Sequence, residues 1–245
     1  MSVTVTNNIF GVNTLVNNHI VENGLTFYYD IYNLDSYPGS GTDMLNITPN
    51  ETIATTTSGS FNGTAVVNNH LVFDGNDDRI DMGENIVLSR SGATLMWWMK
   101  PHTIKNMGLF TIQETGNPYL KLIEFRQNTF YAETDNNCNY FSSPSFTTFS
   151  ANKWRHVAVR FLNNEAHWYI DGSNIGETPN YGQNNCDPPN NQAVSELVND
   201  MTWRYISGGT YSDRFDGEMN QIMLYNRGLP DAEVLQNFIA QRHRY

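Results

Sequence analysis

The chain has 245 residues, enough for one large domain or two small ones, and one large all-β domain is the expectation. Charged residues make up 16% of the chain, below the roughly 25% typical of soluble domains. Instead, 33 Asn residues and 37 Ser plus Thr residues supply uncharged polarity. The 14 Lys plus Arg and 25 Asp plus Glu give a net charge of -11 without a basic run, which argues against a nucleic-acid partner.

The sequence contains no segment of the kind that enters a membrane. Its longest strongly apolar run, residues 94–99, is far shorter than the roughly 20 residues of a membrane span. The first six residues show neither a charged region nor an apolar region of a signal peptide. We therefore expect a soluble protein with no membrane partner and no secretion signal.

Residues 1–23 form an N-terminal extension that is too apolar for a disordered tail. They carry Val3, Val5, Ile9, Phe10, Val12, Leu15, Val16, Ile20 and Val21 between Asn pairs. We expect this extension to be ordered, either as a strand on its own domain or as an arm that adds to the edge of a neighbouring subunit. The main domain is then residues 24–245.

Period-2 segments dominate the rest of the chain and predict many short strands. Residues 154–162 and 166–170 read as a hairpin that places His156 across from His167, both with half-exposed polar tips. Further strand patterns lie at residues 25–32, 71–73, 94–100, 109–113, 120–125, 129–133, 203–207 and 215–225. The fold class predicted from them is an all-β sandwich of two antiparallel sheets. Its core is expected to contain Trp98, Val157, Val159, Trp168, Ile170, Ile222 and Leu224.

Two stretches, residues 36–69 and 172–200, lack any period and are expected to be long loops, either functional or merely decorative. Cys138 and Cys186 lie in Asn-rich loop sequence, where they could form a disulfide in an oxidising place or remain two free thiols.

One short helix is predicted at the C-terminus, where Val234, Leu235, Phe238 and Ile239 repeat with helical spacing. Pro230 suits its first turn, and Arg242 and Arg244 are expected near the negative end of its dipole.

Catalytic motifs are missing from the sequence. It has no Gly-x-Ser-x-Gly elbow, no phosphate-binding glycine loop and no pair of histidines at helical spacing. The Glu-x-Asp-x-x-Glu arrangement of jelly-roll glucanases is also absent, so no catalytic residues are predicted and a glycosidase is the least favoured alternative.

The nearest acidic cluster is residues 74–81, and it is interpreted first as a turn between two strands. The alternative is a calcium site in which Asp77 and Asp78 supply hard oxygen ligands, although the glycine at its second position does not fit the twelve-residue calcium loop. No other cofactor is predicted.

Aromatic residues make up 13% of the chain, and the five tryptophans lie within strand patterns that predict core positions. Tyr140, Phe141 and Tyr181 lie in loop sequence, where an exposed ring can stack on a sugar while Asn and Asp side chains address its hydroxyls. These three residues are the predicted ligand-binding residues.

The order of strand motifs resembles the concanavalin A-like lectin/glucanase superfamily, specifically its laminin G-like branch. The motifs are Gly-Leu-Thr-Phe-Tyr-Tyr-Asp at 24–30, Tyr-Pro-Gly-Ser-Gly at 37–41, Leu-Val-Phe-Asp-Gly-Asn-Asp-Asp-Arg-Ile at 71–80, Trp-Met-Lys-Pro at 98–101, Trp-Arg-His-Val-Ala-Val at 154–159, Tyr-Ile-Asp-Gly at 169–172, Ile-Ser-Gly-Gly at 206–209 and the segment 215–229. The match spans residues 24–240 and implies a jelly-roll sandwich with a short C-terminal helix.

The opening motif and its Ser-Tyr-Pro-Gly segment are similar to versions found in structural proteins of tailed bacteriophages. This resemblance implies a non-enzymatic virion structural protein, a capsid decoration or tail-exterior component, assembled in the host cytoplasm and displayed on the virion surface. Its partners would be other virion proteins or copies of itself. Because the fold does not fix the function, a carbohydrate-binding adhesin for host-surface glycans remains the alternative.

Overall fold

The computed structural model describes residues 19–48, 58–89, 91–111, 121–126, 128–135, 139–145, 149–163, 165–179, 181–182, 201–207 and 214–245. Cys138 and Cys186 lie outside these ranges. Among the described residues, no helix has the length and apolar character needed to cross a membrane.

Two antiparallel sheets pack face to face, as the alternating pattern predicts. The first sheet contains, in spatial order, β14 (Ser173–Pro179), β13 (Glu165–Ile170), β12 (Arg155–Leu162), β7 (Gly92–Pro101), β17 (Asp216–Tyr225), β5 (His70–Asp74) and β4 (Ala65–Val67), with β1 (Leu25–Tyr29) also paired to β17. The second sheet contains β15 (Tyr181–Gly182), β11 (Asn139–Ser142), β10 (Thr129–Asp135), β9 (Lys121–Arg126), β8 (Met107–Thr111), β16 (Met201–Ile206), β6 (Arg79–Leu88), β3 (Ser58–Asn62) and β2 (Asp43–Leu45). The predicted fold class is confirmed.

The predicted hairpin is also present, but the expected long loops are partly wrong. Strands β2, β3 and β4 lie within residues 36–69, and β14 extends the hairpin beyond residue 172. These strands are short or rich in Ser, Thr and Asn, so the alternation of apolar side chains that signals a strand is weak in them.

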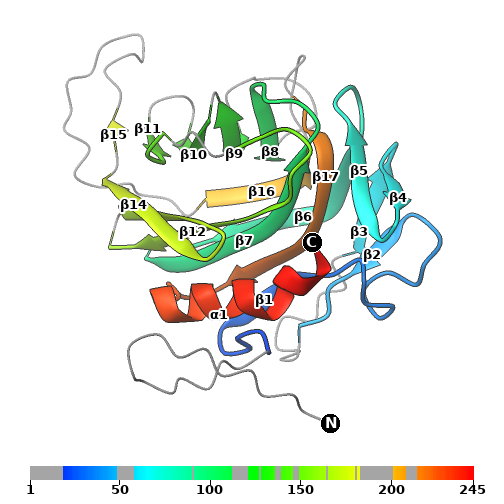
Figure 1. Ribbon diagram of the computed structural model, residues 1–245, viewed down its shortest axis with the longest axis horizontal. Coiled ribbons are helices and arrows are strands. Elements are labelled where there is room, and N and C mark those ends of the chain that lie inside the picture. Colours follow the sequence, from blue (N-terminus) through cyan, green and yellow to red (C-terminus); the bar gives the residue numbers. More distant parts are fainter. Residues whose placement is uncertain are drawn as a thin grey trace.

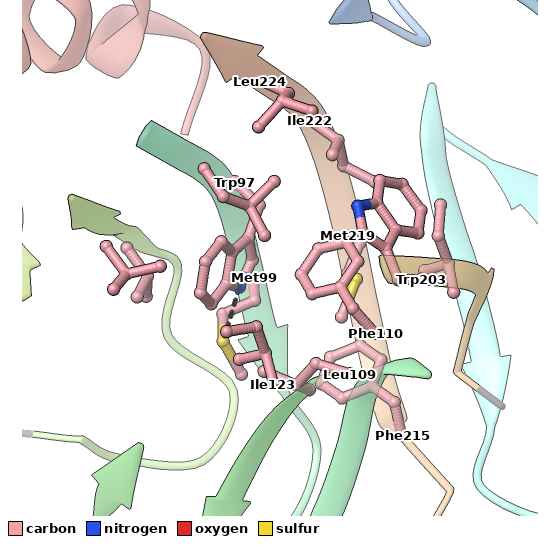
Figure 2. Close-up of a cluster of buried hydrophobic side chains, with 14 of the residues drawn as sticks. Trp97, Met99, Leu109, Phe110, Ile123, Trp203, Phe215, Met219, Ile222 and Leu224 are labelled. Atoms are coloured by element: carbon pink, nitrogen blue, oxygen red, sulfur yellow. Dashed lines mark hydrogen bonds between the residues drawn. The ribbon is translucent and has the colours of Figure 1, made fainter. Parts of the chain in front are cut away.

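The main core lies between the sheets and is dominated by large aromatic rings. Figure 2 shows Trp97 and Met99 of β7 beside Phe110 of β8 and Trp203 of β16. Trp97 meets Phe110 edge to face at a centroid distance of 5.2 Å, and Phe110 meets Trp203 at 5.0 Å. The predicted core residues found in this cluster are Val157, Val159, Trp168, Ile170, Ile222 and Leu224.

Trp98 is the exception among the predicted core residues. It is 3% exposed, but it lies on the opposite face of β7 from Trp97 and outside the cluster between the sheets. It packs there under a third layer, formed by helix α1 (Asp231–Gln241) and the 3-10 turn η2 (Arg242–Arg244). Because this layer also buries the outer face of β7, the strand has no exposed side chains that would show which residues point inward. The sequence pattern therefore assigned Trp98 to the wrong face.

Helix α1 crosses the outer side of β7 and β17, away from β8, β9 and β10 (Figure 1). Pro230 is its N-cap rather than a first-turn residue, and no side chain caps it. Asp231 instead accepts hydrogen bonds from Tyr169 (2.7 Å) and Arg160 (3.0 Å), which fixes the start of the helix to β13 and β12. Arg242 and Arg244 directly follow the C-terminal end of the helix, as expected, and the guanidinium of Arg244 also bonds the buried carboxylate of Asp30 at 2.7 Å.

The described end of the N-terminal extension, residues 19–23, packs on its own domain beside α1. The Val21 amide donates to Asn237 Oδ1 at 2.8 Å, and the Val21 carbonyl accepts from the Tyr225 hydroxyl at 2.7 Å. Val21 is buried in the cluster between the first sheet and α1. Residues 1–18 lie outside the described part of the chain, so the choice between a strand and an arm stays a prediction for them.

The two histidines of the hairpin are not opposite each other, and neither is half-exposed. The cross-strand partner of His167 is Arg160, and His156 lies near the other end of β12. His156 is fully buried between the rings of Trp98 and Phe238, at centroid distances of 5.3 Å and 5.8 Å. Neither of its ring nitrogens has a hydrogen-bond partner.

Burial lowers the pKa of His156 to about 3. The unfolded chain, with an ordinary histidine pKa near 6.5, therefore binds a proton that the folded protein excludes, and stability falls as pH drops below about 6.5. The slope contributed by one such group reaches about 1.4 kcal/mol per pH unit. We predict that His156→Leu flattens the fall in unfolding free energy between pH 6.5 and 5, as measured by urea denaturation.

Other groups that titrate between pH 5 and 6.5 are present in both proteins, so the difference in slope isolates His156. A variant that shows the same slope as the unsubstituted protein would mean that His156 is not kept neutral by its burial.

Candidate functional site

A group of aromatic and charged side chains lies on the outer face of the first sheet, next to the C-terminal segment. Its rings come from Trp154, His70, Tyr32 and Tyr245, and we call these four the aromatic platform. Trp154 directly precedes β12, His70 begins β5, and Tyr32 follows β1. Each member of the platform is partly exposed.

Trp154 is the centre of the aromatic platform. Its ring lies 4.7 Å from the His70 ring and 4.8 Å from the Tyr245 ring, centroid to centroid. Tyr32 extends the group, because its ring lies 5.6 Å from His70 and its hydroxyl is 3.0 Å from His70 Nε2. A partly exposed indole is thus held in place by neighbouring rings on two sides.

The platform is anchored in the buried outer layer through Tyr245. The Tyr245 ring stacks on Trp98 at 4.1 Å with an interplanar angle of 16°, and its hydroxyl donates to Gln221 Oε1 at 3.0 Å. Trp98 in turn stacks on Phe238 of α1 at 5.7 Å and donates its indole N–H to Gln241 at 2.8 Å. A continuous column of rings therefore leads from the helix to Trp154 and restricts its movement.

A row of charged groups borders the platform, and the strand register creates it. Lys100 of β7 and Glu218 of β17 are cross-strand partners, and their side chains form a 2.6 Å hydrogen bond. Glu218 also faces His70 Nδ1 at 3.3 Å and His102 Nε2 at 3.5 Å. Lys100 Nζ lies 6.0 Å from the centre of the Trp154 ring.

The electrostatics of this row keep Glu218 ionised. Partial burial acts to raise the pKa of Glu218, but the hydrogen bond and charge of Lys100, followed by those of His102 and His70, hold it below its usual value. Burial lowers the pKa of His70, and the nearby Lys100 adds to this effect against the opposing charge of Glu218. The row therefore offers a carboxylate acceptor, an ammonium donor and imidazole groups beside an aromatic face.

Such a combination suits the recognition of a sugar. The C–H face of a pyranose or furanose packs on an aromatic ring, and its hydroxyls require donors and acceptors at the ring edge. The sequence placed Trp154 in a strand and hence in the core, so this residue was missed. The available signal was its position between Lys153 and Arg155, which marks the exposed beginning of a strand.

The ligand-binding residues predicted from the sequence lie elsewhere, at the edge of the second sheet. Tyr140 and Phe141 belong to β11 and Tyr181 to β15, so they are strand residues in the backbone and not loop residues. The register pairs Tyr140 with Tyr181 and Phe141 with Ala132. Their side chains lie outside what the structure describes, and their role stays a prediction.

The predicted metal residues Asp77 and Asp78 come together with Asp74 at the turn between β5 and β6. One carboxylate oxygen from each lies within 4.8 Å of the others. Asp74 accepts the backbone and side-chain N–H groups of Asn76, which lowers the pKa of Asp74, and Asp78 accepts the Asp74 amide at 2.9 Å.

This oxygen-only donor set fits Ca²⁺, which takes carboxylate, carbonyl and water ligands. Burial raises the pKa of Asp78, and repulsion from Asp74 and Asp77 adds to this rise, so a bound cation would offset this repulsion. The backbone carbonyl of Asp77 is not free to bind a cation, because it accepts hydrogen bonds from the guanidinium groups of Arg214 (2.6 Å) and Arg79 (3.3 Å). The three carboxylates would therefore be the protein ligands, and water would complete the shell.

We predict that 5 mM CaCl₂ raises the melting temperature of chelator-treated protein, because an ion that binds only the folded state stabilises it by mass action. Asp77→Asn should abolish this shift while the protein stays folded, since Asp77 is exposed. Differential scanning fluorimetry measures both. Identical melting curves with calcium and with chelator would leave the cluster as a turn and no more.

The comparisons with known proteins agree with this architecture. A family model of laminin G type, described as the concanavalin A-like lectin/glucanases superfamily, matches residues 74–235. No curated protein sequence matches the chain.

Solved structures are similar in fold but not in sequence. A Trypanosoma rangeli sialidase in complex with sialic acid matches with a TM-score of 0.62 and 14% identity over 98% of this chain. The chain spans only about a third of the sialidase, 36% of its length. Domain 4 of a Geobacillus stearothermophilus extracellular arabinanase, in complex with arabinotriose, matches with a TM-score of 0.51 and 17% identity, covering 90% of this chain and 100% of that domain.

Proposed function

The chain belongs to the concanavalin A-like lectin/glucanases superfamily, and from that premise we propose that it binds carbohydrate through the aromatic platform around Trp154. The observation that carries this proposal is the partly exposed Trp154 ring, fixed between His70 and Tyr245 beside the Lys100–Glu218 pair. Fixed aromatic faces lose little conformational entropy on binding, which favours recognition of a weakly interacting ligand such as a sugar.

The ligand that this site suits is an uncharged oligosaccharide. Glu218 and Asp216 balance Lys100 and the nearby Lys105, so the region offers hydrogen bonds without a dominant sign of charge. The arabinanase domain of the same fold was solved with arabinotriose, a neutral oligosaccharide, which makes this sugar a reasonable first probe. An acidic sugar would require an excess of cationic groups.

We further propose the setting given by the sequence resemblance, a non-enzymatic structural protein on the capsid or tail exterior of a tailed bacteriophage. The motif order and the surface rich in amides and hydroxyls support this setting. In it, the protein would contact other virion proteins or copies of itself, and the platform would give it an adhesin role toward host-surface glycans.

Trp154→Ala tests the binding proposal. A central aromatic contact contributes about 2 kcal/mol or more to a binding interface, so the Kd for an oligosaccharide should weaken by about 30-fold. The measurement is a glycan array that includes arabinotriose, followed by calorimetry on each retained glycan. Tyr131→Ala is the matched control, because Tyr131 is a partly buried ring under a cation, Arg126, but lies on the second sheet.

Retention of glycan binding in Trp154→Ala, with loss in Tyr140→Ala or Tyr181→Ala, would transfer the site to the edge of the second sheet. An array without any retained glycan would contradict carbohydrate binding. Release of reducing sugar from a bound polysaccharide would contradict the non-enzymatic role.

A further inference from the structure

Three side chains gather on the last two strands of the first sheet, away from both the platform and the aspartate cluster. Glu165 and His167 belong to β13, and Glu177 belongs to β14. His167 is two residues from Tyr169, so both point to the face of the sheet that carries α1. The register makes His167 and Glu177 cross-strand partners, so the sheet itself holds the imidazole and this carboxylate side by side.

The donor atoms of these residues converge. His167 Nδ1 lies 3.4 Å from Glu177 Oε2, and His167 Nε2 lies 3.6 Å from Glu165 Oε2. One donor atom from each of the three residues lies within 4.8 Å of the others. The His167 side chain is only 10% exposed, whereas the two carboxylates are open to solvent at 47% and 66%.

The two N to O distances exceed the usual range of an N–H to O hydrogen bond, about 2.7 to 3.2 Å. The Nδ1 to Glu177 distance matches the separation of about 3.4 Å expected for two ligands that are each about 2.1 Å from a tetrahedral metal ion. A single ion can bind only one nitrogen of the ring, so the three-residue set rests on one donor atom from each residue, all within 4.8 Å of one another. Within the described residues, the His167 ring makes no hydrogen bond. A nine-tenths buried imidazole is therefore aimed at a pair of carboxylates without another polar partner.

The surrounding charges leave this imidazole able to act as a ligand. Arg160, the partner of His167 on β12, is engaged by Asp231 at 3.0 Å and by the Leu229 carbonyl at 3.0 Å. Burial lowers the pKa of His167, and Arg160 adds to this effect against the opposing charges of Glu177, Glu165 and Asp231. Arg160 thus has partners of its own and does not pair with Glu165 or Glu177.

We propose that Glu165, His167 and Glu177 bind a divalent transition metal ion of the Zn²⁺ class, with the remaining coordination positions open to water. A nitrogen donor beside two carboxylates selects such an ion over Ca²⁺ or Mg²⁺, which prefer ligand sets made of oxygen alone. The site is independent of the carbohydrate proposal and of the aspartates between β5 and β6.

Calorimetric titration of the chelator-treated full chain with ZnCl₂ at pH 7.5 tests the site. The expected result is saturable binding of one ion, weakened about tenfold or more in Glu177→Gln and in His167→Gln, since loss even of an outer-shell partner has an effect of this size. Glu177 is solvent-exposed, so its variant reports on the metal even where the histidine variant fails to fold. Asp77→Asn is the control and should bind Zn²⁺ as the unsubstituted protein does.

Cobalt provides a second readout. Co²⁺ bound by a nitrogen and two oxygens should produce visible absorption bands that disappear in Glu177→Gln. Two results would overturn the proposal: no saturable Zn²⁺ binding, or binding of unchanged affinity in both Glu177→Gln and His167→Gln. The latter would assign the ion to other residues.

Discussion

The stacking of Tyr245 on Trp98 closes a third layer over the sandwich, and much of the molecule's organisation depends on it. Trp98 is surrounded by Tyr245, Phe238 and His156, and its indole N–H is satisfied by Gln241. The outer face of β7 is thereby buried at Met96 and Trp98, while Lys100 at its end stays partly exposed. A sheet with two buried faces needs strands that are apolar throughout, which explains the uninterrupted run in β7.

The same layer determines what the surface can do. Buried polar groups, among them Asn237, Gln241 and the Asp30–Arg244 pair, hold the C-terminal segment in one position. The Tyr245 ring in turn packs against the Trp154 ring, and the strand register places Lys100 and Glu218 beside Trp154. The proposed carbohydrate site is therefore a product of the outer layer and of the segments that follow β1 and precede β12.

The sequence predicted the fold well because its strongest signals are local. Alternation identified β12, β13 and β17, and helical spacing identified α1. It failed where burial removes the alternation, as at Trp98, and where strands are short and hydrophilic, as at β2, β3 and β4. Trp154 illustrates a different limit, because an indole at the start of a strand looks the same in sequence whether a neighbour covers it or not.

Sites that depend on distant residues were predicted only in part. Asp77 and Asp78 are adjacent, so their cluster was visible, although the contribution of Asp74 required the turn geometry. The pairing of His167 with Glu177 depends on the register of β13 and β14, which an Asn-rich sequence without alternation does not reveal. The expected pairing of His156 with His167 was wrong for the same reason, because the register was not known.

The five tryptophans can serve as reporters for carbohydrate binding at the aromatic platform. Trp97, Trp98, Trp168 and Trp203 are at most 3% exposed, whereas Trp154 is partly exposed. In a ¹H–¹⁵N spectrum recorded during titration with an oligosaccharide retained on the array, we expect the Trp154 indole resonance to shift saturably while the resonances of the four buried indoles do not move. Saturable binding that leaves the Trp154 resonance unmoved would contradict binding at the aromatic platform.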